Sequence, residues 1–156
     1  MATTTVLAEV LNDLNQINYD RIEGYRKAAE DSKAHDIDLH PVFQKMADVS
    51  RLNVSALTQQ IRAMGVEVES GATTMGKIYH AWMDMKATFT GKGRKAILAA
   101  CEFGEDQAQK AYDKALASDA EMDAATRQMI MTQKNTLLNQ HDEIKSLVDQ
   151  TSERGD

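Results

Sequence analysis

The sequence predicts an all-α fold in which four long helices form an antiparallel bundle, and three observations lead to this prediction. Ala, Leu, Met, Gln, Glu and Lys are abundant, a composition typical of helices. One proline and eight glycines interrupt the 156 residues. Apolar residues recur at spacings of three and four over long stretches, as a helix with one buried face requires. We therefore expect residues 1–156 to form a single domain with its own core.

Breaks in the apolar pattern divide the chain into five helical segments. The four long ones are predicted at about residues 5–33, 41–65, 94–116 and 123–148, and a short one at 74–89. Pro41 suits the first turn of the second helix, and Gly65 is a predicted C-cap. The longest irregular stretch, 66–74, lies before the short helix.

The order of these segments predicts a particular topology. A long connection that carries an extra short helix separates the second long helix from the third, and the other connections are short. One long crossover between two helix pairs is the arrangement of ferritin-like four-helix bundles. A coiled-coil rod is the competing all-α fold, but it requires sustained heptads, which the mixed spacing does not provide.

Charge and cysteine content exclude several classes of function. The net charge of -6 and the pI near 5.2 disfavour nucleic acids and anionic membrane surfaces as partners. Cys101 is the single cysteine, so no disulfide framework exists, as is typical of the reducing cytoplasm. The N-terminus lacks the pattern of a secretory signal, and no apolar run reaches the length of a membrane span. We expect a cytoplasmic protein.

Five polar residues fall on or beside the apolar stripes of the four long helices. At about 100° per residue, Asn18 lies within the stripe of the first helix and Glu105 within that of the third. Ser50 and Asn53 interrupt the stripe of the second helix, and His141 lies at the edge of the stripe of the fourth. The spacing predicts that these five side chains converge in the middle of the bundle.

These positions suggest a metal site that has lost most of its ligands. A di-iron or di-manganese bundle uses a Glu from each of two helices and a Glu-x-x-His motif from each of the others. Asn18 stands at one Glu position, and Ser50, Asn53 and Leu138 replace further ligands, which leaves Glu105 and His141. We therefore expect no cofactor, with iron or manganese at Glu105 and His141 as the alternative.

The simplest expectation for Glu105 is that it is neutralised within the core. An isolated buried carboxylate is costly to desolvate. We expect it to form an ion pair or a hydrogen-bonded pair with His141, satisfied by Asn18 or Tyr25. A proton-transfer pair is a further alternative. Asp20 and Asp106 project away from the stripes and are predicted to be ordinary solvated charges.

A weak internal repeat relates the first and third long helices. Asn18 is followed after six residues by Tyr25-Arg26-Lys27-Ala28, and Glu105 is followed after six residues by Tyr112-Asp113-Lys114-Ala115. A two-fold relation between helix pairs would place both segments at the same depth in the bundle.

Several phrases of the sequence resemble a known family. They are Leu11-Asn12-Asp13-Leu14 and the segments 21–29, 76–84, 101–106 and 141–145. In these phrases the chain resembles the bacterial ferritin-like family catalogued as domain of unknown function 2383. The resemblance implies a four-helix bundle in a bacterial cytoplasm, without an established activity.

Three functions are compatible with these features. The first is a non-catalytic, stress-associated bundle that acts through its surface or as a homodimer. The second is a metal-dependent oxidase or peroxidase with an atypical iron or manganese site. The third is a small-molecule binder with a pocket between Trp82, Phe89 and the bundle. Trp82 lies on the short helix, which we expect to cap the bundle or to form a dimer contact.

Overall fold

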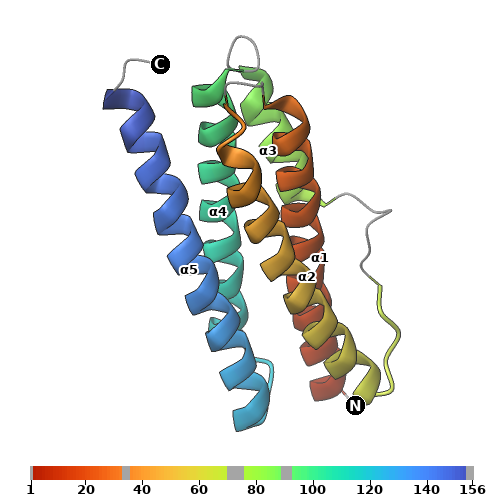
Figure 1. Cartoon of the computed structure of the whole chain (residues 1–156). Coiled ribbons are helices and arrows are strands. Elements are labelled where there is room, and N and C mark those ends of the chain that lie inside the picture. Colours follow the sequence, from red (N-terminus) through yellow and green to blue (C-terminus); the bar gives the residue numbers. More distant parts are fainter. Residues whose placement is uncertain (1, 33–35, 70–75, 89–92, 154–156) are drawn as a thin grey trace.

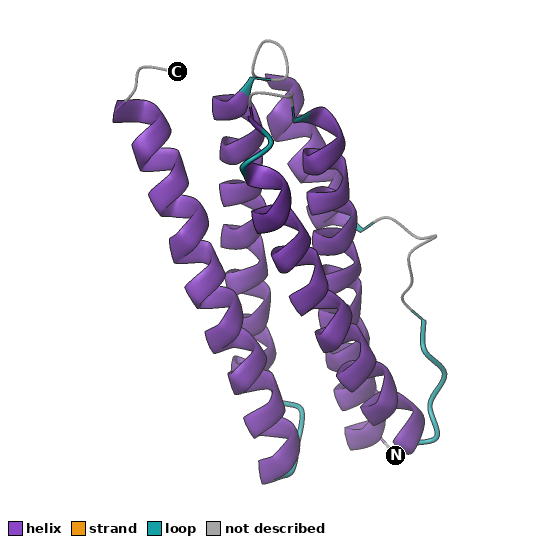
Figure 2. Ribbon diagram, viewed as in Figure 1, coloured by secondary structure: helices purple, strands orange, loops and turns teal. Residues whose placement is uncertain are grey.

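A computed structural model of the chain describes residues 2–32, 36–69, 76–88 and 93–153. In this part of the chain all regular structure is helical (Figure 2). The helices are α1 (Ala2–Asp31), α2 (Leu39–Ala63), α3 (Lys77–Thr88), α4 (Arg94–Ala117) and α5 (Ala124–Glu153). The predicted all-α class and the five helical segments are confirmed. The bounds differ by a few residues, most at the C-terminal end of α5, which continues beyond the predicted residue 148.

The helix ends have identifiable local causes. Gly65 follows α2 with a φ of 74°, in the left-handed region that glycine adopts at little cost. Its N–H donates to the carbonyl of Arg62 at 2.9 Å, so the predicted C-cap is present. At the start of α5, the carboxylate of Asp123 accepts the N–H of Thr126 at 2.8 Å, which satisfies one of the unpaired donors of a helix N-terminus.

The long helices lie side by side in Figure 1, with α2 beside α1 and α5 beside α4. Asn15 of α1 contacts Thr58 of α2, and Arg21 of α1 contacts Met46 of α2. The residue numbers in contact decrease along α2 as they increase along α1, so these two helices run in opposite directions. Helix α3 packs against α1 and α4. Within the described residues, no helix is long and apolar enough to cross a membrane.

The buried apolar side chains form two clusters. One includes Leu7, Leu11, Leu14, Leu57, Ile61, Ala108, Tyr112, Ala115, Ala120, Ile130 and Leu137. The other includes Tyr25, Ala28, Leu39, Phe43, Met46, Ala47, Trp82, Ile97, Leu98, Ala100, Cys101 and Ile144. In the space between the two clusters, every long helix contributes at least one buried polar side chain. The core is therefore divided along the helix axes into apolar, polar and apolar layers.

Trp82 fixes α3 to the bundle. Its side chain is 1% exposed, and its ring meets the ring of Tyr25 edge-on, with the centroids 5.1 Å apart. It lies directly against Gly24 of α1 and Gly104 of α4, where an added Cβ would fall within 2.8 and 2.2 Å of its ring atoms. The short helix thus covers the surface of α1 and α4 at Trp82, and the alternative of a dimer contact stays a prediction. The space predicted to hold a small molecule is filled at Trp82, and its other predicted wall, Phe89, lies outside the described residues.

Asp20 holds the N-terminal end of α3, and the prediction that it is a solvated charge is wrong. Its carboxylate is fully buried and accepts the backbone N–H of Gly76 at 3.0 Å and of Tyr79 at 3.3 Å. Gln16 donates to the same carboxylate at 2.9 Å. Burial raises the pKa of Asp20 above its usual value, although these hydrogen bonds act in the opposite direction. The side chain points away from the core stripe of α1 but is covered by α3.

Candidate functional site: a buried polar layer

The spacing of residues along α1 places three polar side chains in the core. Leu14, Asn18, Arg21 and Tyr25 follow one another at steps of four, three and four, which keeps them on one face of a helix. All four are buried. The layer between the two apolar clusters is therefore built around Asn18 and Arg21.

Arg21 is the centre of this layer. Its side chain is fully buried, and its guanidinium carries five N–H donors. Nε donates to Oε1 of Glu105 at 3.2 Å, and Nη2 donates to Oε2 of Glu105 at 2.7 Å and to Oε1 of Gln140 at 2.9 Å. Nη1 donates to the carbonyl of Met46 at 3.3 Å and to the hydroxyl of Ser50. All five donors therefore have an acceptor.

Glu105 is neutralised by this cation. The two parallel bonds from Arg21 form the bidentate pair that matches a planar guanidinium to a carboxylate. The hydroxyl of Tyr25 also donates to Oε2 of Glu105. Burial and the negative charge of Glu105 raise the pKa of Tyr25 well above its usual value, so the hydroxyl keeps its proton and acts as a donor.

Asn18 organises the part of the layer nearest the other apolar cluster. Its amide donates to the carbonyl of Leu14 and to the hydroxyl of Tyr112, both at 2.9 Å. Its carbonyl accepts hydrogen bonds from Ser50 at 2.9 Å and from Asn53 at 3.1 Å. These four bonds use both donors and both lone pairs of the amide. Ser50 joins the two halves of the network because it also accepts from Arg21.

The internal repeat appears as a reciprocal pair of contacts. Tyr25 of α1 donates to Glu105 of α4, while Tyr112 of α4 accepts from Asn18 of α1. Tyr112 in turn donates to Oε1 of Gln133 at 2.7 Å. The tyrosine of each repeat therefore forms a hydrogen bond with the polar residue that begins the other repeat. The predicted similarity in depth is supported by these two contacts.

The prediction that His141 joins the polar layer is wrong. Its Nε2 lies 2.6 Å from Oδ1 of Asp106, and its Nδ1 lies 3.2 Å from Oδ1 of Asp142, near the surface of α4 and α5. Burial by itself lowers the pKa of His141, but the hydrogen bonds to the two carboxylates outweigh it, so the pKa is raised above its usual value. The protonated ring can donate to both carboxylates at once.

The prediction of the partners of Glu105 was therefore only partly right. Tyr25 contacts it as predicted, whereas His141 contacts Asp106 instead. Asn18, Ser50 and Asn53 converge as expected. The helix spacing explains the error, because on α5 the buried residues Ile130, Gln133, Leu137, Gln140 and Ile144 follow at steps of three and four, and this places Gln140 inside and His141 one residue to the side.

Arg21 is the main residue that the sequence reasoning missed. Its position seven residues after Leu14 and four before Tyr25 was a sufficient signal. Lys and Arg are rarely fully buried unless they are paired, and Arg21 was not among the polar residues predicted to face inward. A cation on the stripe of one helix and an anion on the stripe of another together indicate a buried ion pair.

The buried layer is closed and balanced in charge. Arg21 and Glu105 carry opposite charges, and removing either would leave the other without compensation in the core. Cys101 lies nearby in the core, where burial and the charge of Glu105 raise the pKa of its thiol well above its usual value. The thiol therefore stays protonated and unreactive. The arrangement links polar side chains of all four long helices through hydrogen bonds.

Comparison with known proteins identifies the family. The family model described as Domain of unknown function (DUF2383) matches residues 6–118, well over half of the chain. The chain therefore belongs to this family. The matched range contains most of α1 and all of α2, α3 and α4, and hence Arg21, Ser50 and Glu105, while Gln140 and His141 lie on α5 beyond it. No curated protein matches the chain.

Proposed function

We propose that this member of the DUF2383 family is a non-catalytic helical bundle in which a buried arginine–glutamate pair takes the place of a di-metal centre. The supporting observation is the full set of acceptors around Arg21. Its guanidinium provides beside Glu105 the positive charge that metal ions provide in a di-iron bundle. A metal ion at Glu105 would have to displace this bidentate cation.

The ligands around Glu105 do not fit a di-metal site. Iron and manganese in such bundles are bridged and neutralised by several carboxylates. In the polar layer Glu105 is accompanied by the neutral side chains of Asn18, Ser50, Asn53 and Gln140. Within the described residues, no group of three or more His, Cys, Asp or Glu side chains is arranged to hold a metal ion. The chemistry of these donors supports a structural role for the layer.

The ferritin-like character of the bundle belongs to the same proposal. Helix α1 pairs with α2 and α4 with α5, and the long connection between the pairs carries α3. The reciprocal contacts of Tyr25 and Tyr112 fit two helix pairs related by an approximate two-fold axis. A bacterial cytoplasmic setting and action through the surface, alone or as a homodimer, remain predictions from the sequence.

Metal analysis tests the proposal. The full-length protein is purified without a tag after growth with added iron and manganese, and its metal content is measured by plasma mass spectrometry. We expect substoichiometric metal in the wild type and no significant change in the Glu105→Gln and His141→Gln variants. Near-stoichiometric iron or manganese that is lost in Glu105→Gln, with the helical circular dichroism spectrum retained, would overturn the proposal and favour the metal-dependent oxidase.

A further inference from the structure

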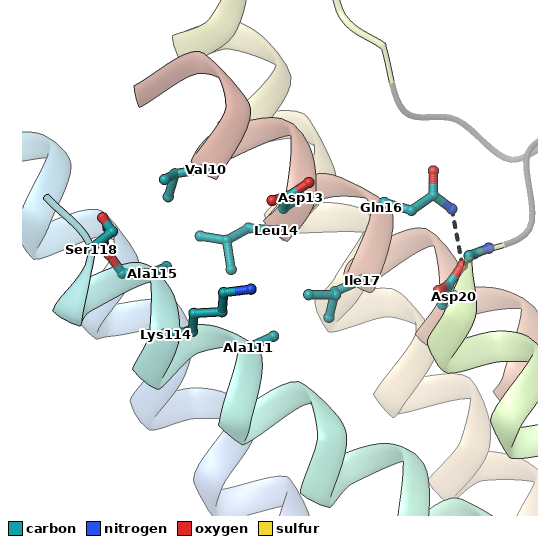
Figure 3. Close-up of a pocket in the computed structure, with 11 residues that line it drawn as sticks. Val10, Asp13, Leu14, Gln16, Ile17, Asp20, Ala111, Lys114, Ala115 and Ser118 are labelled. Carbon is teal, nitrogen blue, oxygen red and sulfur yellow. Dashed lines mark hydrogen bonds between the residues drawn. The ribbon is translucent and has the colours of Figure 1, made fainter. Parts of the chain in front are cut away.

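A groove with a volume of about 330 Å³ lies between α1 and α4, next to the N-terminal end of α3 (Figure 3). Its walls are mostly apolar and come from Val10, Leu14, Ile17, Ala111 and Ala115. The polar groups around it include Asp13, Gln16, Asp20, Lys114 and Ser118. A largely apolar hollow with a few polar groups is the usual form of a small-ligand site, and this volume is at the small end of the range.

The groove exists because α3 covers one part of the surface between α1 and α4. Trp82 lies against Gly24 and Gly104. The repeat that aligns Asn18 with Glu105 also aligns Gly24 with Ala111 and Ile17 with Gly104. Ala111 and Ile17 line the groove, so the groove is the counterpart, in the internal repeat, of the position that Trp82 fills.

This correspondence also limits what can enter. A Cβ at Gly104 would lie 2.2 Å from the ring of Trp82, and Ile17 has a Cβ and a branched side chain at the equivalent position. A side chain as large as an indole therefore cannot lie as deep in the groove as Trp82 lies under α3. A narrow, flexible apolar chain fits the remaining space better than a broad ring system.

The positive charge that faces the groove comes from α4, and Asp13 and Asp20 of α1 carry the carboxylates beside it. Figure 3 shows the side chain of Lys114 extending over the apolar floor, with its ammonium group drawn between Leu14 and Ile17. With the described residues Lys114 makes no ion pair. The carboxylate of Asp20 is already bound by the N–H groups of Gly76 and Tyr79. Asp13 lies on α1, on the opposite wall, and is drawn beside Leu14.

We propose that this groove binds a small carboxylate with an apolar chain, and that Lys114 holds the carboxylate. The apolar chain lies along Leu14, Ile17 and Ala111, where its burial provides most of the binding free energy. The ammonium group of Lys114 gives the site its preference for an anion. The proposal concerns a surface outside the polar layer and does not depend on that layer being non-catalytic.

Three molecules with one chain length and different head groups test this assignment. Octanoate, octanol and octylamine are titrated into the full-length protein by isothermal titration calorimetry. Because the site is partly open, we expect octanoate to bind about fivefold more tightly than octanol. We expect Lys114→Met to abolish this difference while octanol binding is unchanged, and Ala111→Leu to weaken both ligands because it fills the floor of the groove.

Lys27→Met is the matched control, because Lys27 is the counterpart of Lys114 in the repeat and lies outside the residues that line the groove. The control makes the same change in charge and should leave octanoate binding unchanged. Tighter binding of octylamine than of octanoate would overturn the proposal and assign the head group to Asp13. Equal binding of all three ligands, an equal loss in both lysine variants, or no binding at millimolar ligand would also overturn it.

Discussion

The buried pair of Arg21 and Glu105 makes a quantitative prediction about stability. Both side chains are fully buried, and the carboxylate is held by two bonds from the guanidinium and one from Tyr25. Arg21→Met keeps much of the apolar stem but leaves Glu105 without a counter-charge. Removal of one member of a buried pair costs about 3–5 kcal/mol, because the remaining charge is not compensated. We expect Arg21→Met to lose free energy of unfolding in this range.

The double variant Arg21→Met/Glu105→Leu removes both charges. It leaves the hydroxyl of Tyr25 and the side chains of Ser50 and Gln140 with fewer partners, at a cost of about 1–3 kcal/mol for a buried group that is left unsatisfied. No uncompensated charge remains, so the double variant should be more stable than Arg21→Met alone. The coupling free energy of the cycle is then at least about 2 kcal/mol.

Urea unfolding monitored by far-ultraviolet circular dichroism measures these differences. The free energies of unfolding of wild type, both single variants and the double variant are compared by linear extrapolation, with the slopes required to agree. Additive effects of the two substitutions, or a double variant less stable than either single variant, would refute the assignment of Arg21 and Glu105 as a mutually compensating pair.

Three further predictions follow from other contacts. Gly104→Ala should lose about 1–3 kcal/mol of stability because its Cβ would overlap Trp82, and the urea midpoint should fall accordingly. His141 has a raised pKa, so its ionic contacts stabilise the fold fully below its ordinary pKa, and this stabilisation is lost as pH rises through the raised value. The free energy of unfolding of the wild type should therefore fall by up to about 1 kcal/mol between about pH 6 and pH 9. The free energy of unfolding of His141→Gln should fall less over the same range. Asp20→Ala should speed amide hydrogen exchange in α3, with a cost of about 1 kcal/mol for the lost N-terminal acceptor; unchanged exchange there would argue against its anchoring role.

The sequence predicted the helices well because their causes are local. Apolar spacing, the left-handed Gly65 and the cap at Asp123 act within a few residues of where they appear. The end of α5 was placed too early because polar residues after Val148 weaken the apolar pattern without ending the helix. Periodicity reports which face is buried and says little about where an exposed helix terminates.

The sequence predicted which residues face the polar layer better than it predicted which of them contact one another. Asn18, Ser50, Asn53 and Glu105 follow from helix spacing alone, because each lies on an apolar stripe. That Glu105 pairs with Arg21 and not with His141 depends on the rotation of α5, which turns Gln140 inward. A difference of one residue is about 100° of rotation, and a margin position such as that of His141 cannot be assigned from its own helix.

The sequence by itself determined the helical class, the five segments and four of the polar residues that face the core, because these depend on backbone propensity and on a period of 3.6 residues. The tertiary structure decided which charges meet, how Trp82 lies against Gly24 and Gly104, and that Asp20 is buried beneath α3. It also decided that part of the surface between α1 and α4 stays open as a groove. These features depend on contacts between residues that are distant in the chain, and the pattern within one helix does not encode the position and rotation of its neighbours.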